Sequence, residues 1–88
     1  MKYASYLGQV IKKQGFPKLN ERAIQDYFNV IFLEGQLAAY KKMKSKLNQD
    51  ELHKFELELF KLNNGITKIT GNLPPREFLR LLINRERE

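Results

Sequence analysis

The feature that most constrains the fold is one long stretch, residues 21–47, whose apolar side chains recur at helical spacing. Asn20 suits an N-cap, and Glu21 suits a first helical turn because the helix dipole favours a carboxylate there. As a single helix this stretch would be about 40 Å long, which is long for a chain of 88 residues. The other elements must therefore pack along it.

Glycine, proline and asparagine mark the other boundaries. Residues 2–14 have helical spacing, and Gly15 followed by Pro17 ends this first helix, because proline disfavours helical geometry in the residue before it. Asn48 and Glu51 are spaced like a capping box, which predicts the start of another helix. The sequence thus predicts one helix on each side of the long one.

The segment Asn63-Asn64-Gly65 is expected to end the helix that begins after Asn48, because Asn and Gly tolerate positive φ. The β-branched residues in 66–72 would suit a strand, but no second strand is available for pairing. We therefore expect an ordered connection there, with at most one helical turn. Two consecutive prolines then open a last helix, since proline is tolerated at the first helical position.

These elements predict an all-α fold, a single small domain with an irregular bundle of about four helices around the long central one. The expected helices are residues 2–14, 21–47, 49–62 and 75–86. The long helix also contains three small residues on neighbouring positions, Gly35, Ala38 and Ala39. They would let another helix approach closely within the chain, form a homodimer seam, or mark a kink.

Positive charge is concentrated in the first half of the chain. Residues 1–46 carry nine basic and three acidic side chains, a net charge of +6, whereas residues 47–88 carry seven of each. Such a field attracts polyanions or acidic protein surfaces. We expect six lysines to form a nucleic-acid-binding surface if the first helix ends near the long helix: Lys12, Lys13, Lys41, Lys42, Lys44 and Lys46. The alternative is that these lysines only offset a helix dipole and keep the protein soluble.

Arg76 and Arg80 are a second candidate contact with nucleic acid. Their spacing of four places them on one face of the last helix, and arginine is a residue type that reads guanine edges. Glu77 lowers the local charge, so a solvated outer face is the alternative interpretation. The connection before this helix is too long for the turn of a helix-turn-helix motif.

The sequence carries no catalytic signature, and we expect no catalytic residue, metal site or cofactor. The chain has no cysteine and one histidine, His53, and neither Ser5 nor Ser45 lies in a sequence typical of a catalytic serine. The five glycines are scattered and form no phosphate-binding loop. These observations predict a non-enzymatic binding protein.

The long helix has more apolar residues than one buried face needs. Those assigned to a protein partner are Phe32, Leu33, Leu37 and Tyr40. They support an alternative function as a protein-interaction module, such as a small regulator, inhibitor or assembly factor, binding an acidic protein or forming a homodimer. A basic amphipathic helix on an anionic membrane surface is a third interpretation. No apolar run reaches the roughly 20 residues that span a bilayer, so we expect no membrane span and a cytoplasmic, intracellular location.

Overall fold

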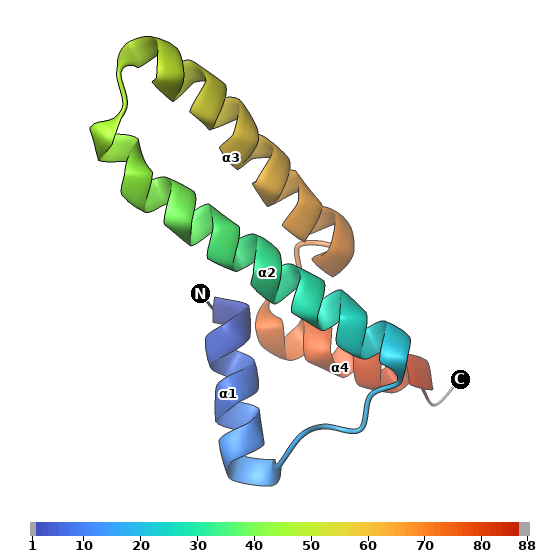
Figure 1. Ribbon diagram of the computed structural model, residues 1–88. Coiled ribbons are helices and arrows are strands. Elements are labelled where there is room, and N and C mark those ends of the chain that lie inside the picture. Colours follow the sequence, from blue (N-terminus) through green and yellow to red (C-terminus); the bar gives the residue numbers. More distant parts are fainter. Residues whose placement is uncertain (1, 87–88) are drawn as a thin grey trace.

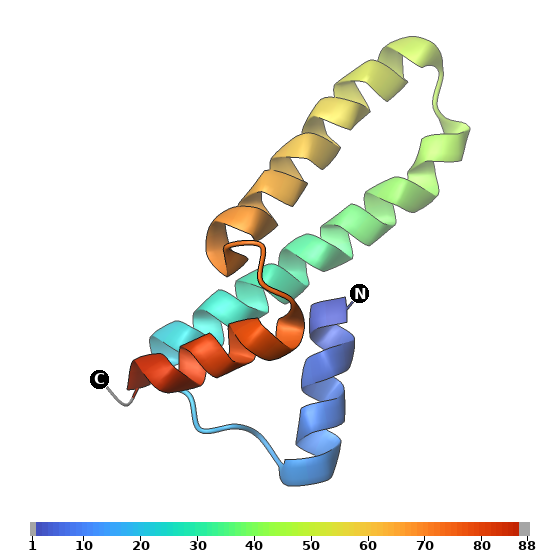
Figure 2. The same cartoon turned by 180° about the vertical axis from the view of Figure 1, so that it is seen from behind.

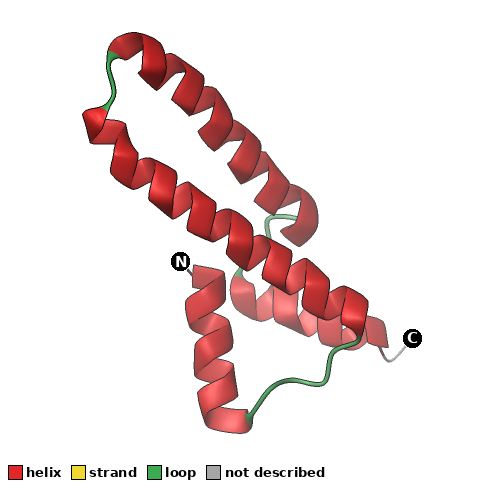
Figure 3. Ribbon diagram, viewed as in Figure 1, coloured by secondary structure: helices red, strands yellow, loops and turns green. Residues whose placement is uncertain are grey.

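The computed structural model describes residues 2–86 and consists of helices joined by short connections (Figure 1). In chain order the elements are α1 (Lys2–Gln14), α2 (Glu21–Met43), the 3-10 turn η1 (Lys44–Lys46), α3 (Gln49–Thr70) and α4 (Pro75–Glu86). Figure 3 shows helices and loops but no strand over these residues. The predicted all-α fold is confirmed: the described chain forms a small domain of four α-helices.

α2 begins as predicted but ends earlier. Asn20 is its N-cap, with an extended backbone and a side-chain Oδ1 that accepts a hydrogen bond from the Ala23 N–H at 2.8 Å. The predicted continuation to residue 47 is wrong, because Lys44–Lys46 tighten into η1 and Leu47 is extended, with φ −100° and ψ 147°. Asn48 is itself extended in order to cap α3, so the preceding helix has to end before it.

The predicted end of the third helix at residue 62 is also wrong. α3 continues without a break through Asn63-Asn64-Gly65 to Thr70, and the expected connection over residues 66–72 is mostly helix. Gly65 lies inside α3 and faces α2, where an added Cβ would be 3.2 Å from Leu33 Cδ1. This glycine therefore permits a close helix approach instead of ending the helix.

Burial explains why α3 extends beyond its weak helix formers. Ile66 and Ile69 pack against the main core, and this gain offsets the cost of about 1 kcal/mol for a glycine inside a helix. The helix ends where the backbone becomes left-handed, at Gly71 with φ 62° and Asn72 with φ 64°. The Gly71 N–H donates to the Thr67 carbonyl, as expected at a helix C-terminus.

α2 and α3 form an antiparallel hairpin, while α1 and α4 pack beside the N-terminal half of α2 (Figures 1 and 2). The main core lies where α1, α2 and α4 meet. Its buried residues are Tyr3, Leu7, Ala23, Tyr27, Val30, Phe78, Leu79 and Leu82. Beyond this core the hairpin continues as an arm, residues 39–62, in which Phe55 is buried edge-on against Tyr40 with ring centroids 4.9 Å apart.

The projecting arm makes the molecule elongated. Its radius of gyration is 15.2 Å, against about 12 Å for a compact domain of this length. The accessible surface is 6705 Å², whereas a compact protein of this mass exposes about 5,400 Å². Several large apolar side chains are exposed over the molecule, and three of them, Met43, Leu57 and Phe60, lie on the arm; the others are Ile11, Phe16, Phe28, Phe32 and Leu81.

Candidate functional site

The end of the arm carries the densest positive charge of the described chain. Four exposed lysines occur within six residues there, Lys41, Lys42, Lys44 and Lys46. We call this group the lysine tip. Among residues 2–85 the two ion pairs are Lys61–Glu58 and Arg85–Asp26, so no carboxylate of these residues lies within 4 Å of the tip ammonium groups. The four charges therefore face solvent and are available to an anion.

The turn behind the lysine tip is held by hydrogen bonds on both sides. Asn48 Oδ1 accepts from the Glu51 N–H at 2.8 Å, and Asn48 Nδ2 donates to Glu51 Oε1 at 3.0 Å. The predicted cap is thus confirmed, although the Glu51 carboxylate accepts from the side-chain amide of the cap instead of its backbone. On the other side, the Leu47 N–H donates to the Lys44 carbonyl at 3.4 Å. These contacts fix where the tip lysines are presented.

The structure does not bring the six predicted lysines together. Lys12 and Lys13 lie at the C-terminal end of α1, which Figure 1 places at the opposite end of the molecule from the lysine tip. Arg76 and Arg80 lie elsewhere again, along a groove of about 400 Å³ between α1 and α4. The predicted nucleic-acid-binding residues therefore do not form one surface with the lysine tip, because α1 points away from the arm; the groove of Arg76 and Arg80 instead includes Gln14 at the end of α1.

The four predicted partner-binding residues also divide. Leu33, Leu37 and Tyr40 are half-buried in the hairpin, where Leu33 contacts Gly65 and Tyr40 packs on Phe55. Phe32 remains 64% exposed. The exposed apolar residues that sequence reasoning left out of this set lie beside it on α2, at Phe28 and Met43, and on α3, at Leu57 and Phe60.

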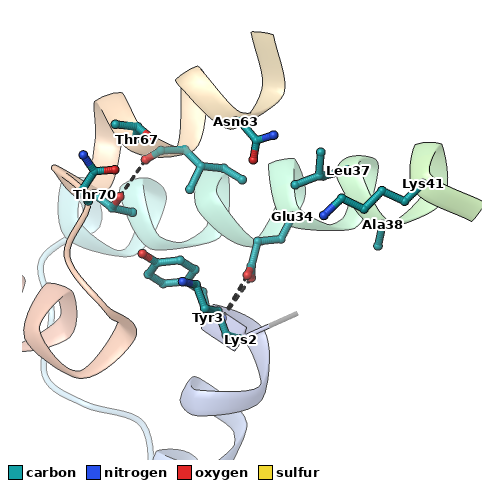
Figure 4. Close-up of a pocket in the computed structure, with 11 residues that line it drawn as sticks. Lys2, Tyr3, Glu34, Leu37, Ala38, Lys41, Asn63, Thr67 and Thr70 are labelled. Atoms are coloured by element: carbon teal, nitrogen blue, oxygen red, sulfur yellow. Dashed lines mark hydrogen bonds between the residues drawn. The ribbon is translucent and has the colours of Figure 1, made fainter. Parts of the chain in front are cut away.

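A cleft of about 640 Å³ opens where the start of α1 meets α2 and the end of α3 (Figure 4). Lys2 and Lys41 contribute the positive charges of its lining, and Figure 4 shows Lys41 reaching back along α2 over the cleft. Asn63 and Thr67 line it from α3. Glu34 is the carboxylate of this cleft, and its contacts decide what the cleft does.

Glu34 caps α1 from a different helix. Its carboxylate accepts the Tyr3 N–H at 3.1 and 3.2 Å and the Ala4 N–H at 3.3 Å, and the side chain is buried. The first turn of α1 has no acidic residue of its own, so Glu34 satisfies N–H groups that the helix leaves unpaired and complements its dipole. The floor of the cleft is thus a structural junction whose acceptor atoms are already occupied.

Tyr3 connects this junction to the core. Its hydroxyl donates to the Leu73 carbonyl in the link before α4, and its own carbonyl accepts from the Tyr27 hydroxyl at 2.8 Å. Burial, with the negative charge of Glu34 as a second cause, raises the pKa of the Tyr27 phenol above its usual value of about 10. Tyr27 therefore stays protonated and acts as a hydrogen-bond donor.

The role of Glu34 was missed by sequence reasoning, although a signal existed. Ala23, Tyr27, Val30 and Glu34 follow one another at spacings of 4, 3 and 4, which places all four on one helix face. This inner row is the buried side of α2. A carboxylate on a buried row needs hydrogen-bond donors, and an uncapped helix nearby is a source of them.

The described side chains offer no metal-binding cluster, since no three of His, Cys, Asp or Glu come together in residues 2–85. His53 is exposed on α3. No helix of this part of the chain has both the length and the apolar character needed to cross a bilayer.

Comparison with known proteins found no family model that matches the chain, and no match among curated proteins or solved structures. The geometry of the lysine tip and of the apolar surfaces is therefore the basis for assigning a function.

Proposed function

We propose that this protein is a non-enzymatic binding module that contacts polyanions, foremost the phosphates of intracellular nucleic acid, through the lysine tip. The observation that carries the proposal is the cluster Lys41, Lys42, Lys44 and Lys46, exposed at the end of a projecting arm without an ion-pair partner among residues 2–85. Lysine binds phosphate as a point charge and gains affinity by releasing counterions, largely without regard to sequence.

The arm suits this role because it carries Lys42, Lys44 and Lys46 away from the rest of the surface, while Lys41 also lines the cleft beside the start of α1. The C-terminal end of α2 carries a partial negative charge of about half an elementary charge. It attracts the lysines but cannot neutralise four positive charges. The hydrogen bonds of Asn48 and Glu51 hold the turn, so little backbone ordering is needed on binding.

The test is fluorescence anisotropy with labelled duplex and single-stranded oligonucleotides over a range of salt concentrations. Four phosphate contacts predict a log–log salt slope of about −3.6 for duplex DNA. A variant with all four tip lysines changed to Gln should bind about tenfold or more weakly. No binding to either oligonucleotide at about 50 mM salt would overturn the proposal.

A matched control separates the tip from overall charge. Changing Lys12, Lys13, Lys18 and Lys68 to Gln removes the same four charges, lowering the net charge from +6 to +2 as in the tip variant. These four lysines are also exposed, so both variants should stay folded. We expect the control to retain most of the affinity, and equal losses in the two variants would show that the lysine tip is not the site.

A second candidate function, a protein-interaction module, is favoured by the exposed apolar side chains. Phe28 and Phe32 lie one turn apart on α2, and Leu57 and Phe60 lie one turn apart on α3; each is at least 46% exposed. Adjacent large apolar residues on a small elongated domain are typical of an interaction surface. This candidate is compatible with polyanion binding, because the two surfaces use different residues.

A further inference from the structure

We propose that a second copy of this chain covers the outer face of α2, packing antiparallel to it about a two-fold axis that crosses this face at the height of residues 33 and 34. This inference rests on the second candidate function and names its partner. Its basis is a set of four residues, the outer row, at spacings of 4, 3 and 4: Phe28, Phe32, Gly35 and Ala39. The buried inner row of α2 has the same spacing and lies about 140° away around the helix.

Three of the four residues of the outer row are exposed in the described chain, and Gly35 is partly buried. Phe28 is 46% and Phe32 64% exposed, and Ala39 is exposed as well. α2 lies in front of α4 in Figure 1 and behind it in Figure 2, so α4 packs on one side of α2 only. A helix that is apolar on two opposite faces is normally buried on both.

The outer row is complementary to itself when it is reversed. In an antiparallel pair centred between residues 33 and 34, Phe28 lies opposite Ala39 of the second copy, and Phe32 lies opposite Gly35. Each large ring thus meets a small residue, and two-fold symmetry makes every such contact twice. A parallel pair would instead place ring on ring and leave the two glycines facing each other across a gap.

Charge favours the same orientation. Glu21 lies on the outer face at the start of α2, whereas the lysine tip lies at its end, so antiparallel packing brings the acidic start of each helix to the basic end of the other. A parallel pair would place two lysine tips side by side. The helix dipoles also oppose each other favourably in an antiparallel pair.

Antiparallel packing also separates the two lysine tips. The helical rise places the two lysine tips about 30 Å apart in the dimer, since their centres are separated by about 20 helical residues.

Sedimentation equilibrium over a wide concentration range tests the dimer. The wild-type protein should approach twice its monomer mass of 10.4 kDa, and Phe32→Glu and Ala39→Arg should each weaken the dimer by about tenfold or more. Both sites are exposed in the single chain, so circular dichroism should show an unchanged helix content. Phe16→Glu is the matched control, because Phe16 in the link between α1 and α2 is also exposed, at 49%, but belongs to neither apolar surface.

The chain has no cysteine, so cross-linking reports the orientation directly. In an oxidised mixture of Phe28→Cys and Ala39→Cys, antiparallel packing should give mainly the mixed disulfide dimer. Disulfide dimers of Ala39→Cys with itself would show parallel packing and overturn the proposal, as would a wild-type chain that stays monomeric. A monomer that still binds oligonucleotide through the lysine tip would leave the polyanion proposal standing, and a dimer without such binding would remove only that proposal.

Discussion

The two halves of α2 lie in different surroundings. The N-terminal half lies in a core shared with α1 and α4, where Tyr27, Val30 and Phe78 are almost completely buried. The C-terminal half belongs to the arm and has α3 as its packing neighbour among the described residues, with Phe55 as the buried side chain. One half therefore holds the fold together, and the other carries exposed charge. This contrast shows that a long helix in a small domain can be buried along one part of its length and exposed along another, because its neighbours do not cover all of it.

The largest difference between core and arm should appear when the buried ring that packs against each half of α2 is removed, Phe78 against Tyr27 and Phe55 against Tyr40. Phe78→Ala should lower the free energy of unfolding by about 3–5 kcal/mol, because it leaves a cavity under Tyr3 and Tyr27. Phe55→Ala should cost less, since the arm around it relaxes more easily. Urea denaturation measures both values, and an equal or larger loss at Phe55 would break the distinction between core and arm.

Hydrogen exchange tests directly whether the arm can open while the core stays folded. Phe55→Ala should accelerate exchange in the arm and leave the amides around Phe78 protected, because local opening does not require the core to unfold. Exchange that rises uniformly over α1 to α4 would show that arm and core unfold as one unit.

An intermediate effect is expected at the boundary between the two halves. Glu34→Ala removes the carboxylate that accepts the Tyr3 and Ala4 N–H groups, and buried donors without partners cost about 1–3 kcal/mol. Glu34→Gln keeps one oxygen acceptor, so it should lower the free energy of unfolding by less than Glu34→Ala does. The readout is the unfolding free energy together with amide exchange in the first turn of α1, and an unchanged first turn would contradict the capping role.

The smallest effect is expected from Tyr27→Phe, which deletes the hydrogen bond to the Tyr3 carbonyl at a cost of about 1 kcal/mol. Because burial raises the pKa of the folded phenol, the unfolded chain loses this proton first, so its contribution is complete below about pH 10 and is lost as the pH rises further. Above about pH 10 the variant should therefore lose stability less steeply than the wild type. Parallel slopes in thermal unfolding would show that the phenol does not contribute.

Local sequence signals predicted the structure where the controlling interaction is itself local. Asn20 and Asn48 cap the helices that follow them, and each bonds to an N–H three residues ahead. Glycine was ambiguous, since Gly65 and Gly71 have the same chemistry but different roles. Gly71 ends α3, whereas Gly65 provides the close contact with Leu33. Only the neighbouring helix distinguishes them.

The candidate site also combines features set by local sequence with features set by tertiary structure. The exposure of the four lysines at the tip follows from their own helix, because successive residues on a helix cannot all face the core. Their separation from Lys12 and Lys13 depends on the direction of α1, which no local pattern specifies. The same direction brings the start of α1 to Glu34, so a residue in the middle of α2 becomes the cap of another helix.

The amino-acid sequence by itself determined the helical class, most helix starts and the concentration of charge, because capping, periodicity and charge act over a few residues. Tertiary structure decided the length of α3, the cap supplied by Glu34, the separation of the lysines and the exposure of the outer row. These depend on which helices meet and at what angle, since burial free energy is gained between elements distant in the chain.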